Sequence, residues 1–357
     1  MALKTVFLGT PAFAAASLEA LVGAGMPPLL VVTRQDQPRG RGLKLQPSDV
    51  RACAERLGLP VATPRPFHDP AFLEQLRGLQ PDVFAIVAYG VILKEAALRL
   101  PRLGCINVHA SLLPRWRGVS PIAWQILSGD AQAGVTTQWI DAGVDTGQVI
   151  HRDAFPMPPD ATTGTLTEEL ARRGAELLVR TLREVEAGSA PRETQDPAAA
   201  TLAPRFGKDD GRLDWTRSAA WLERAARAFD PWPGLRFRMG EGAVRVRRAA
   251  VAGVAAAPGD APHAGGTSVA GDTPRPGTVL RVGAGRVVVA AGEGALELVE
   301  VQPDGKRAMP ADAWARGRGV GPGGLLASGV PPAGAGGPGS GAGPGASSAS
   351  APRGDAS

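Results

Sequence analysis

The chain is poor in cysteine and has no long apolar run. Only Cys53 and Cys105 occur among its 357 residues, which excludes a framework of several disulfides and a metal site built from four thiolates. No uninterrupted apolar stretch approaches the ~18 residues that a membrane-spanning helix needs. These absences favour a cytoplasmic protein that does not associate with a membrane.

The N-terminus begins with a lysine and apolar residues, a pattern that superficially resembles an export signal. Its apolar core, residues 6–8, is interrupted at once by Gly9 and Pro11. A signal peptide uses ~7–15 apolar residues. We therefore interpret this segment as a first β-strand and its turn.

The chain also lacks a strong charge imbalance, with 39 basic and 34 acidic residues and a net charge of +5. The basic excess falls mainly in residues 206–320. Such an excess is compatible with an RNA-binding surface, but it is also common on an ordinary solvated face. Charge alone therefore assigns no partner.

The first 190 residues have the pattern of alternating strands and helices. Short apolar, β-branched runs predict strands at residues 4–9, 28–34, 82–90, 104–110 and 134–140, and helical spacing predicts helices between them and over 165–188. The alternation predicts an α/β fold with a doubly wound, mostly parallel, Rossmann-like sheet over residues 1–190. Ligands bind at the C-terminal ends of such strands, where residues 9–11, 88–90 and 107–109 would meet.

The rest of the chain has a different composition. Residues 191–205 are rich in proline and alanine and predict a linker. Residues 206–320 contain a helical segment and several short strands separated by turns, which predicts a small antiparallel, OB-like β-barrel. Residues 252–276 resemble a disordered insertion, and residues 321–357 a disordered Gly/Ala/Pro/Ser tail, because both are short of apolar side chains.

A polar pair, Asn107 and His109, stands on an otherwise apolar segment. Its two-residue spacing puts both side chains on one face of a strand. A carboxamide beside an imidazole can donate hydrogen bonds to an oxygen that becomes negative during a reaction. A second cluster places Asp145 near two glycines, in a loop that can approach another loop closely. By itself, Asp145 would equally suit a turn, and a lone histidine is more often structural than catalytic.

Both segments resemble the formyltransferases that use 10-formyltetrahydrofolate, and the match is closer to the methionyl-tRNA formyltransferases. The matching strings are GTPAFA (9–14), VAYGVIL (87–93), CINVHASLLPRWRG (105–118), AFDPWPG (228–234) and QPDGKRAM (302–309). They cover about residues 1–318. The resemblance implies that Asn107, His109 and Asp145 are catalytic and that no metal is used. It also implies formyl transfer from 10-formyltetrahydrofolate to the α-amine of methionyl initiator tRNA, which prepares it for translation initiation.

The same resemblance implies the binding residues. The folate would be bordered by Tyr89, Gly90, Ser111, Leu112, Leu113 and Pro114. The cationic loop of residues 34–48 would become ordered on phosphates at the acceptor end of the tRNA. Within it we expect tRNA contacts from Arg39, Arg41 and Lys44, while Leu43 stands where the family often has a second base. We expect the enzyme to be a monomer.

Three other interpretations remain open. A formyltransferase or formyl hydrolase acting on a small amine, a sugar nucleotide or water would share the catalytic trio, although the loop of residues 34–48 and the C-terminal part argue for a larger substrate. A non-catalytic RNA-binding module would not need the trio. A nicotinamide oxidoreductase would need a Gly-x-Gly-x-x-Gly fingerprint, which residues 9–14 lack.

Overall fold

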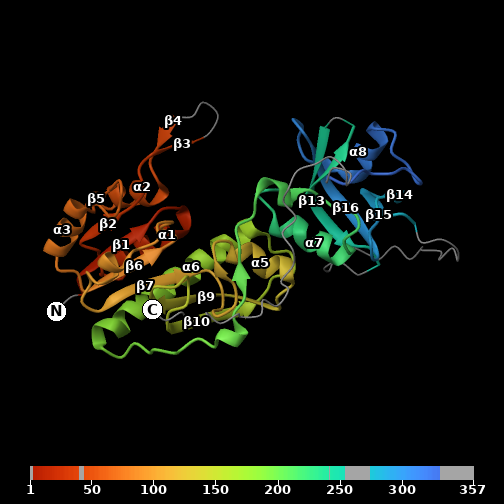
Figure 1. The fold of residues 1–357 in the computed structure, drawn as a ribbon. Helices are drawn as coiled ribbons and strands as arrows, with labels where there is room; N and C mark the ends of the chain where they lie inside the picture. Colours follow the sequence, from red (N-terminus) through yellow and green to blue (C-terminus); the bar gives the residue numbers. More distant parts are fainter. Residues whose placement is uncertain (1–2, 40–43, 241, 254–273, 330–357) are drawn as a thin grey trace, which may run out of the picture.

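The computed structural model describes residues 3–39, 44–240, 242–253 and 274–329. It has an N-terminal part built on a seven-stranded sheet and a C-terminal part built on an antiparallel sheet (Figure 1). Within these residues, each helix is too short or too polar to cross a membrane.

The N-terminal sheet has the strand order β10-β9-β7-β6-β1-β2-β5. Its strands are β1 (Thr5–Gly9), β2 (Leu30–Val32), β5 (Val61–Ala62), β6 (Val83–Val87), β7 (Gly104–His109), β9 (Gln132–Trp139) and β10 (Val149–Pro156). All neighbouring pairs are parallel except the two that β9 makes with β7 and β10. The predicted mostly parallel, Rossmann-like sheet is therefore confirmed. Strand β10 was missed because charged residues interrupt its apolar pattern.

Helices cover both faces of this sheet. On one face α1 (Ala12–Gly23), α2 (Asp49–Arg56), α5 (Pro121–Ser128) and α6 (Thr163–Ala187) share a core with Phe7 and Ile106. On the other face α3 (Pro70–Gly78) and α4 (Glu95–Leu98) pack with Val6 and Phe84. Neighbouring residues of one strand thus enter opposite cores, as the pleat requires. The arrangement puts the loops after β1, β6 and β7 at one edge of the sheet.

The C-terminal sheet is antiparallel, with the order β12-β13-β16-β15-β14 and β17 paired to β16. Its strands are β12 (Arg236–Met239), β13 (Gly242–Val251), β14 (Val279–Gly283), β15 (Arg286–Ala290), β16 (Ala295–Pro303) and β17 (Met309–Pro310), accompanied by helices α7 (Ala219–Ala228) and α8 (Ala311–Gly317). Trp215, Phe237 and Trp314 lie in its core with less than a twentieth of their surface exposed. This is the small antiparallel β domain that the sequence predicts.

The prediction of disorder from residue 321 onward is wrong for residues 321–329. The backbone N–H of Val279 donates to the carbonyl of Gly324 (2.8 Å), and that of Arg238 donates to the carbonyl of Ala327 (3.2 Å). The segment therefore joins β14 to β12, the two outer strands of the sheet, and buries the side chain of its own Leu326. Composition hid this contact because backbone groups make most of it. Residues 330–357 and most of the predicted 252–276 insertion lie outside the described residues.

The predicted linker, residues 191–205, is fixed to the N-terminal part along much of its length. Glu193 and Val149 exchange two backbone hydrogen bonds, at 2.8 and 2.9 Å. Strand β11 (Leu202–Ala203) pairs in parallel with β8 (Arg117–Gly118). The prediction of a linker did not include these backbone pairings, because a proline-rich composition gives no sign of them.

Candidate active site

Asn107 and His109 lie at the C-terminal end of β7, near the middle of the sheet. In the register, Asn107 is opposite Ile86 of β6 and Gln138 of β9. Ile106 and Val108 point into the core beneath α1 and α6. Asn107 and His109, which alternate with them, therefore share the other face, as their spacing predicts. Asn107 is half-buried, and His109 is 6% exposed.

The carboxylate of Asp145 lies against this pair. Its Oδ1 is 3.4 Å from Nδ2 of Asn107 and accepts a hydrogen bond from Nε2 of Gln138 at 2.9 Å. Its Oδ2 is 3.5 Å from Nδ1 of His109 and accepts from the backbone N–H of Gly118 at 2.9 Å. The structure thus brings together the three residues for which the sequence predicts catalysis.

His109 is held at its second ring nitrogen as well. Its Nε2 lies 2.8 Å from the carbonyl oxygen of Trp116. Because a carbonyl oxygen can only accept, Nε2 carries a proton in this contact. Nδ1 then faces Asp145, so the carboxylate is placed to stabilise the imidazole whenever both nitrogens are protonated.

Asp145 reaches this position through an unusual backbone conformation. Its φ is 53°, in the left-handed region that residues with a side chain rarely adopt. The next glycine, Gly147, packs so tightly that a Cβ there would lie 1.7 Å from the carbonyl oxygen of Trp139. Asp141, earlier in the loop, accepts hydrogen bonds from the N–H of Gly143 at 3.0 Å and from the hydroxyl of Thr146 at 2.6 Å. Asp141 therefore shapes the loop, while Asp145 points into the site.

Two glutamines of the site were missed by sequence reasoning. Gln138 contacts Asp145 directly, and Gln195 donates from Nε2 to the carbonyl oxygens of Asp145 (2.9 Å) and Gly147 (2.7 Å). A polar residue near the end of the buried strand β9, opposite Asn107, was a usable signal for Gln138. No signal marked Gln195, which comes from the supposed linker.

The segment predicted to border the folate, residues 111–114, is a loop whose polar groups are mostly hydrogen-bonded within the protein. Ser111 is fully buried, and its hydroxyl donates to the carbonyl of Arg115 at 2.6 Å. Leu113 is 1% exposed, with its N–H bound to Thr136 and its carbonyl bound to Arg152. Leu112 and Pro114 are only partly buried. These contacts fix the shape of the loop beside His109.

The loop after β6 supplies the other predicted folate residues. Tyr89 is buried, which raises the pKa of its phenol to about 12, and its ring packs edge-on against Phe67. Gly90 is exposed and has a φ of 79°. Ile92, two residues later, is 81% exposed. Tyr89 therefore anchors the loop, whereas Gly90 and Ile92 face outward.

The basic side chains of the loop after His109 have internal partners. Arg115 pairs with Asp130 at 2.6 Å, and the indole N–H of Trp116 donates to the same carboxylate at 2.7 Å. Arg117 donates to Oε1 of Gln195. These groups are engaged in holding the loop rather than free for a ligand.

The cationic loop of residues 34–48 contains a hairpin that the sequence pattern did not reveal. Strands β3 (Gln37–Arg39) and β4 (Lys44–Gln46) pair antiparallel and project from the N-terminal part (Figure 1). Lys44 is exposed on β4, and Arg39 ends β3. Arg41 and Leu43 lie outside the described residues. At the base of the hairpin is a cavity of about 220 Å³, lined by Thr10, Arg34, Gln35, Gln37, Pro38, Gln46 and Ser48.

Comparison with known proteins places these features in a family. The family model described as "Formyl transferase" matches residues 3–182, and "Formyl transferase, C-terminal domain" matches residues 205–319. In the part of the chain that the structure describes, no group of three or more His, Cys, Asp or Glu side chains is arranged to hold a metal ion.

Two curated relatives are similar over almost the whole chain. Methionyl-tRNA formyltransferase from Symbiobacterium thermophilum is 46% identical over 319 residues, covering 89% of this chain and 93% of the relative. The enzyme of the same name from Halorhodospira halophila is 45% identical, covering 90% and 99%. Among solved structures, an N-formyltransferase from Helicobacter canadensis in complex with folinic acid and dTDP-3-aminofucose has the same fold. Its TM-score is 0.59 at 16% identity, covering 83% of this chain and 98% of that one.

Proposed function

The chain belongs to the methionyl-tRNA formyltransferase family, and we propose that Asn107, His109 and Asp145 carry out its reaction. The enzyme transfers a formyl group to the α-amine of methionyl initiator tRNA, and we take 10-formyltetrahydrofolate as the donor. The observation that carries the residue assignment is the convergence of Asn107 and His109 on one carboxylate, Asp145, at the C-terminal end of β7.

The amine of the methionyl group attacks the formyl carbon, and negative charge develops on the formyl oxygen. Asn107 is suited to stabilise this charge, because its amide has two N–H groups and its contact with Asp145 is a long 3.4 Å. His109 would supply a second donor when Nε2–H leaves the carbonyl of Trp116 as substrates bind. Such donors typically contribute ~10²–10³ in rate each.

Asp145 would support the proton transfers. The attacking amine must lose a proton, and the folate nitrogen that leaves must gain one. The carboxylate lies 3.5 Å from Nδ1 of His109, so it would hold the imidazole in place while protons move between the amine and the folate nitrogen. The folate brings the activated carbon, and the protein supplies orientation and electrostatics.

The edge of the sheet beside Asn107 suits a flat, partly apolar folate. Strand β6, which is paired with β7, leads into Gly90 and the exposed Ile92. The rigid loop of residues 111–114 lies on the other side of His109. Tyr89, Ser111 and Leu113 are buried, so we propose that they shape the folate site, while Gly90, Leu112 and Pro114 border the ligand.

We propose that residues 1–190 perform the chemistry and that the hairpin and residues 206–320 bind the tRNA. The strands of the projecting hairpin carry Arg39 and Lys44, Arg41 lies between them in the sequence, and the cavity at the base of the hairpin would accept the aminoacyl end. Most of the chain's positive excess lies in residues 206–320. The proposal implies a cytoplasmic enzyme, since the charged initiator tRNA is cytoplasmic, and we propose that it acts as a monomer.

The assignment of the acceptor is tested by offering labelled 10-formyltetrahydrofolate to the protein with four acceptors in turn. These are charged initiator tRNA, a charged elongator tRNA, free methionine and water. We expect label in the initiator tRNA fraction and at most traces elsewhere. Preferential formylation of a small amine, or release of free formate, would contradict the proposal.

A further inference from the structure

Gln195 lies within the active-site network although it is distant in sequence from the catalytic trio. It is 5% exposed. Its Nε2 donates to the carbonyl oxygens of Asp145 and Gly147, and lies 3.3 Å from Oε1 of Gln138. Its Oε1 accepts two hydrogen bonds from the guanidinium of Arg117, at 3.1 and 2.8 Å. Both ends of this buried amide are therefore satisfied.

We propose that Gln195 is a positioning residue that holds Asp145 in its catalytic orientation, an inference that rests on the proposed function. The reason lies in the backbone of Asp145, whose φ of 53° is costly for a residue with a side chain. Such conformations are unfavourable and persist only where the surroundings enforce them. Gln195 binds the carbonyl of Asp145 itself and that of Gly147, and so ties down both ends of this turn.

Gln195 also joins the two segments that supply partners to the Asp145 carboxylate. On one side, Oε1 of Gln195 accepts a hydrogen bond from Arg117. The next residue, Gly118, donates its N–H to Oδ2 of Asp145. Gln138, which it contacts on the other side, binds Oδ1. Removing Gln195 would therefore loosen both partners of the carboxylate together.

The network has a fixed direction. A guanidinium can only donate, so Oε1 of Gln195 must face Arg117 and its NH₂ group must face the Asp145 turn. Oε1 of Gln138 then accepts from Gln195, and the NH₂ group of Gln138 is left to donate to Asp145. Arg117 thus orients two successive amides, so that Asp145 receives only donors.

The test is a double-mutant cycle on formyl transfer to charged initiator tRNA. The variants are Gln195→Ala, Asp145→Asn and the double variant, with kcat and the KM for tRNA measured for each. Gln195→Ala should lower kcat about tenfold or more with little change in KM. In the Asp145→Asn background the same change should have almost no further effect, because Gln195 acts through Asp145.

A second substitution keeps the test valid if Gln195→Ala folds poorly. Gln195→Met nearly keeps the volume of the buried side chain and adds no charge, but it cannot donate to the two carbonyls. It should therefore lose kcat like the alanine variant while melting above it, because it leaves a smaller cavity. The matched control is Gln148→Ala, a nearby glutamine whose side-chain contact is with Arg192 at 3.5 Å. The control should keep wild-type kcat.

Three results would overturn the role of Gln195. They are a kcat within twofold of wild type for both Gln195 variants, a loss seen only in KM, or equal effects of Gln195→Ala in the two backgrounds. All three are read against a wild-type enzyme that formylates the tRNA. A wild-type protein that fails to do so would instead contradict the proposed function.

Discussion

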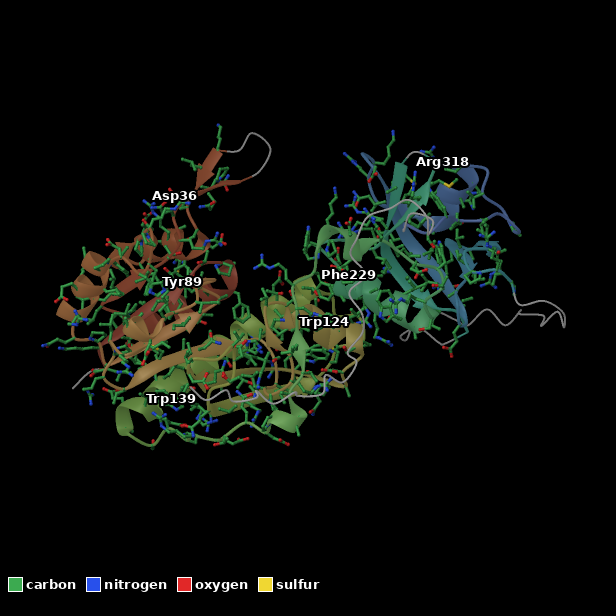
Figure 2. All side chains as sticks on the ribbon, viewed as in Figure 1. Asp36, Tyr89, Trp124, Trp139, Phe229 and Arg318 are labelled. Atoms are coloured by element: carbon green, nitrogen blue, oxygen red, sulfur yellow. The ribbon has the colours of Figure 1, made fainter. Side chains whose placement is uncertain are left out.

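The carbonyl oxygen of Trp116 lies 2.8 Å from Nε2 of the catalytic candidate His109. Trp116 has a φ of 62°, and its ring stacks on Trp124, which in turn stacks on Phe206 at 4.8 Å. Phe206 meets Phe229 at the end of α7, and Figure 2 shows Trp124 and Phe229 where the two parts of the molecule adjoin. Trp116, whose carbonyl holds His109, is therefore also the first ring in a row of aromatic contacts that links the N-terminal part to the C-terminal part.

Asp145→Asn should reduce turnover strongly while leaving folate affinity almost unchanged. The substitution keeps the shape but removes the negative charge 3.5 Å from Nδ1 of His109, on which the proposed proton transfers depend. We expect kcat to fall at least about a hundredfold, by analogy with the loss of a group stabilising transition-state charge. Titration of the folate by fluorescence, alongside the kinetics, separates the two effects. A variant that loses only folate affinity would make Asp145 a binding residue.

Shortening the C-terminal end should affect stability according to where the cut is made. A chain ending at residue 320 loses the segment that joins β14 to β12 and buries Leu326. Burial of one leucine contributes about 1.5–3 kcal/mol, so a clear fall in melting temperature is expected.

The control for this truncation is a chain that ends at residue 329. It retains the contacts of Gly324, Leu326 and Ala327 and should melt like the full chain. Equal melting temperatures for the chains ending at 320 and 329 would show that the segment adds nothing to the stability of the sheet.

Arg41→Leu should weaken the use of tRNA and flatten its dependence on salt. Each phosphate that a basic side chain neutralises releases counterions, so losing one contact lowers the slope of affinity against salt. KM for charged initiator tRNA should be measured at several salt concentrations, with folate binding measured separately. Arg77→Leu, on α3, is the control for loss of one surface charge, because Arg77 pairs with Glu74. A loss confined to folate binding would contradict the prediction, because it would mean that Arg41 contributes to the folate site and not to tRNA binding.

Neither cysteine should react with thiol reagents while the protein is folded. Both are buried, and burial raises the pKa of Cys53 and raises that of Cys105 to about 12. The folded state thus keeps protons that an unfolded chain loses above about pH 8.5. Their contribution to stability is therefore unchanged below that pH and falls as the pH rises toward 12. Labelling at pH 7.5 should be slow until denaturant is added, and rapid labelling of the native protein would contradict this burial.

The sequence was most informative where side-chain pattern determines structure. Strands β1 and β6 are mostly apolar runs, β7 is apolar except for Asn107 and His109, and α6 has a clear apolar stripe, so the layered N-terminal sheet follows from periodicity. The Asn107 and His109 pair was visible because polar residues are costly in a buried strand.

The sequence was least informative where backbone hydrogen bonds determine structure. The segment of residues 321–329 and the β11 pairing with β8 use carbonyl and N–H groups that every sequence has. Gln195 is part of the active-site network for a similar reason, since two of its four partners are backbone carbonyls brought near by the fold. No composition or spacing rule identifies such contacts.

The most direct test of the central claim is a single-turnover measurement of formyl transfer by the wild type, His109→Ala and Asn107→Ala. Labelled 10-formyltetrahydrofolate and charged initiator tRNA are held at saturating concentrations, so that the rate reports on the chemical step alone. We predict that each folded variant transfers the formyl group ~10²–10³ more slowly than the wild type, because one donor to the developing oxyanion is missing. Near wild-type rates in both folded variants would contradict the assignment of the catalytic site.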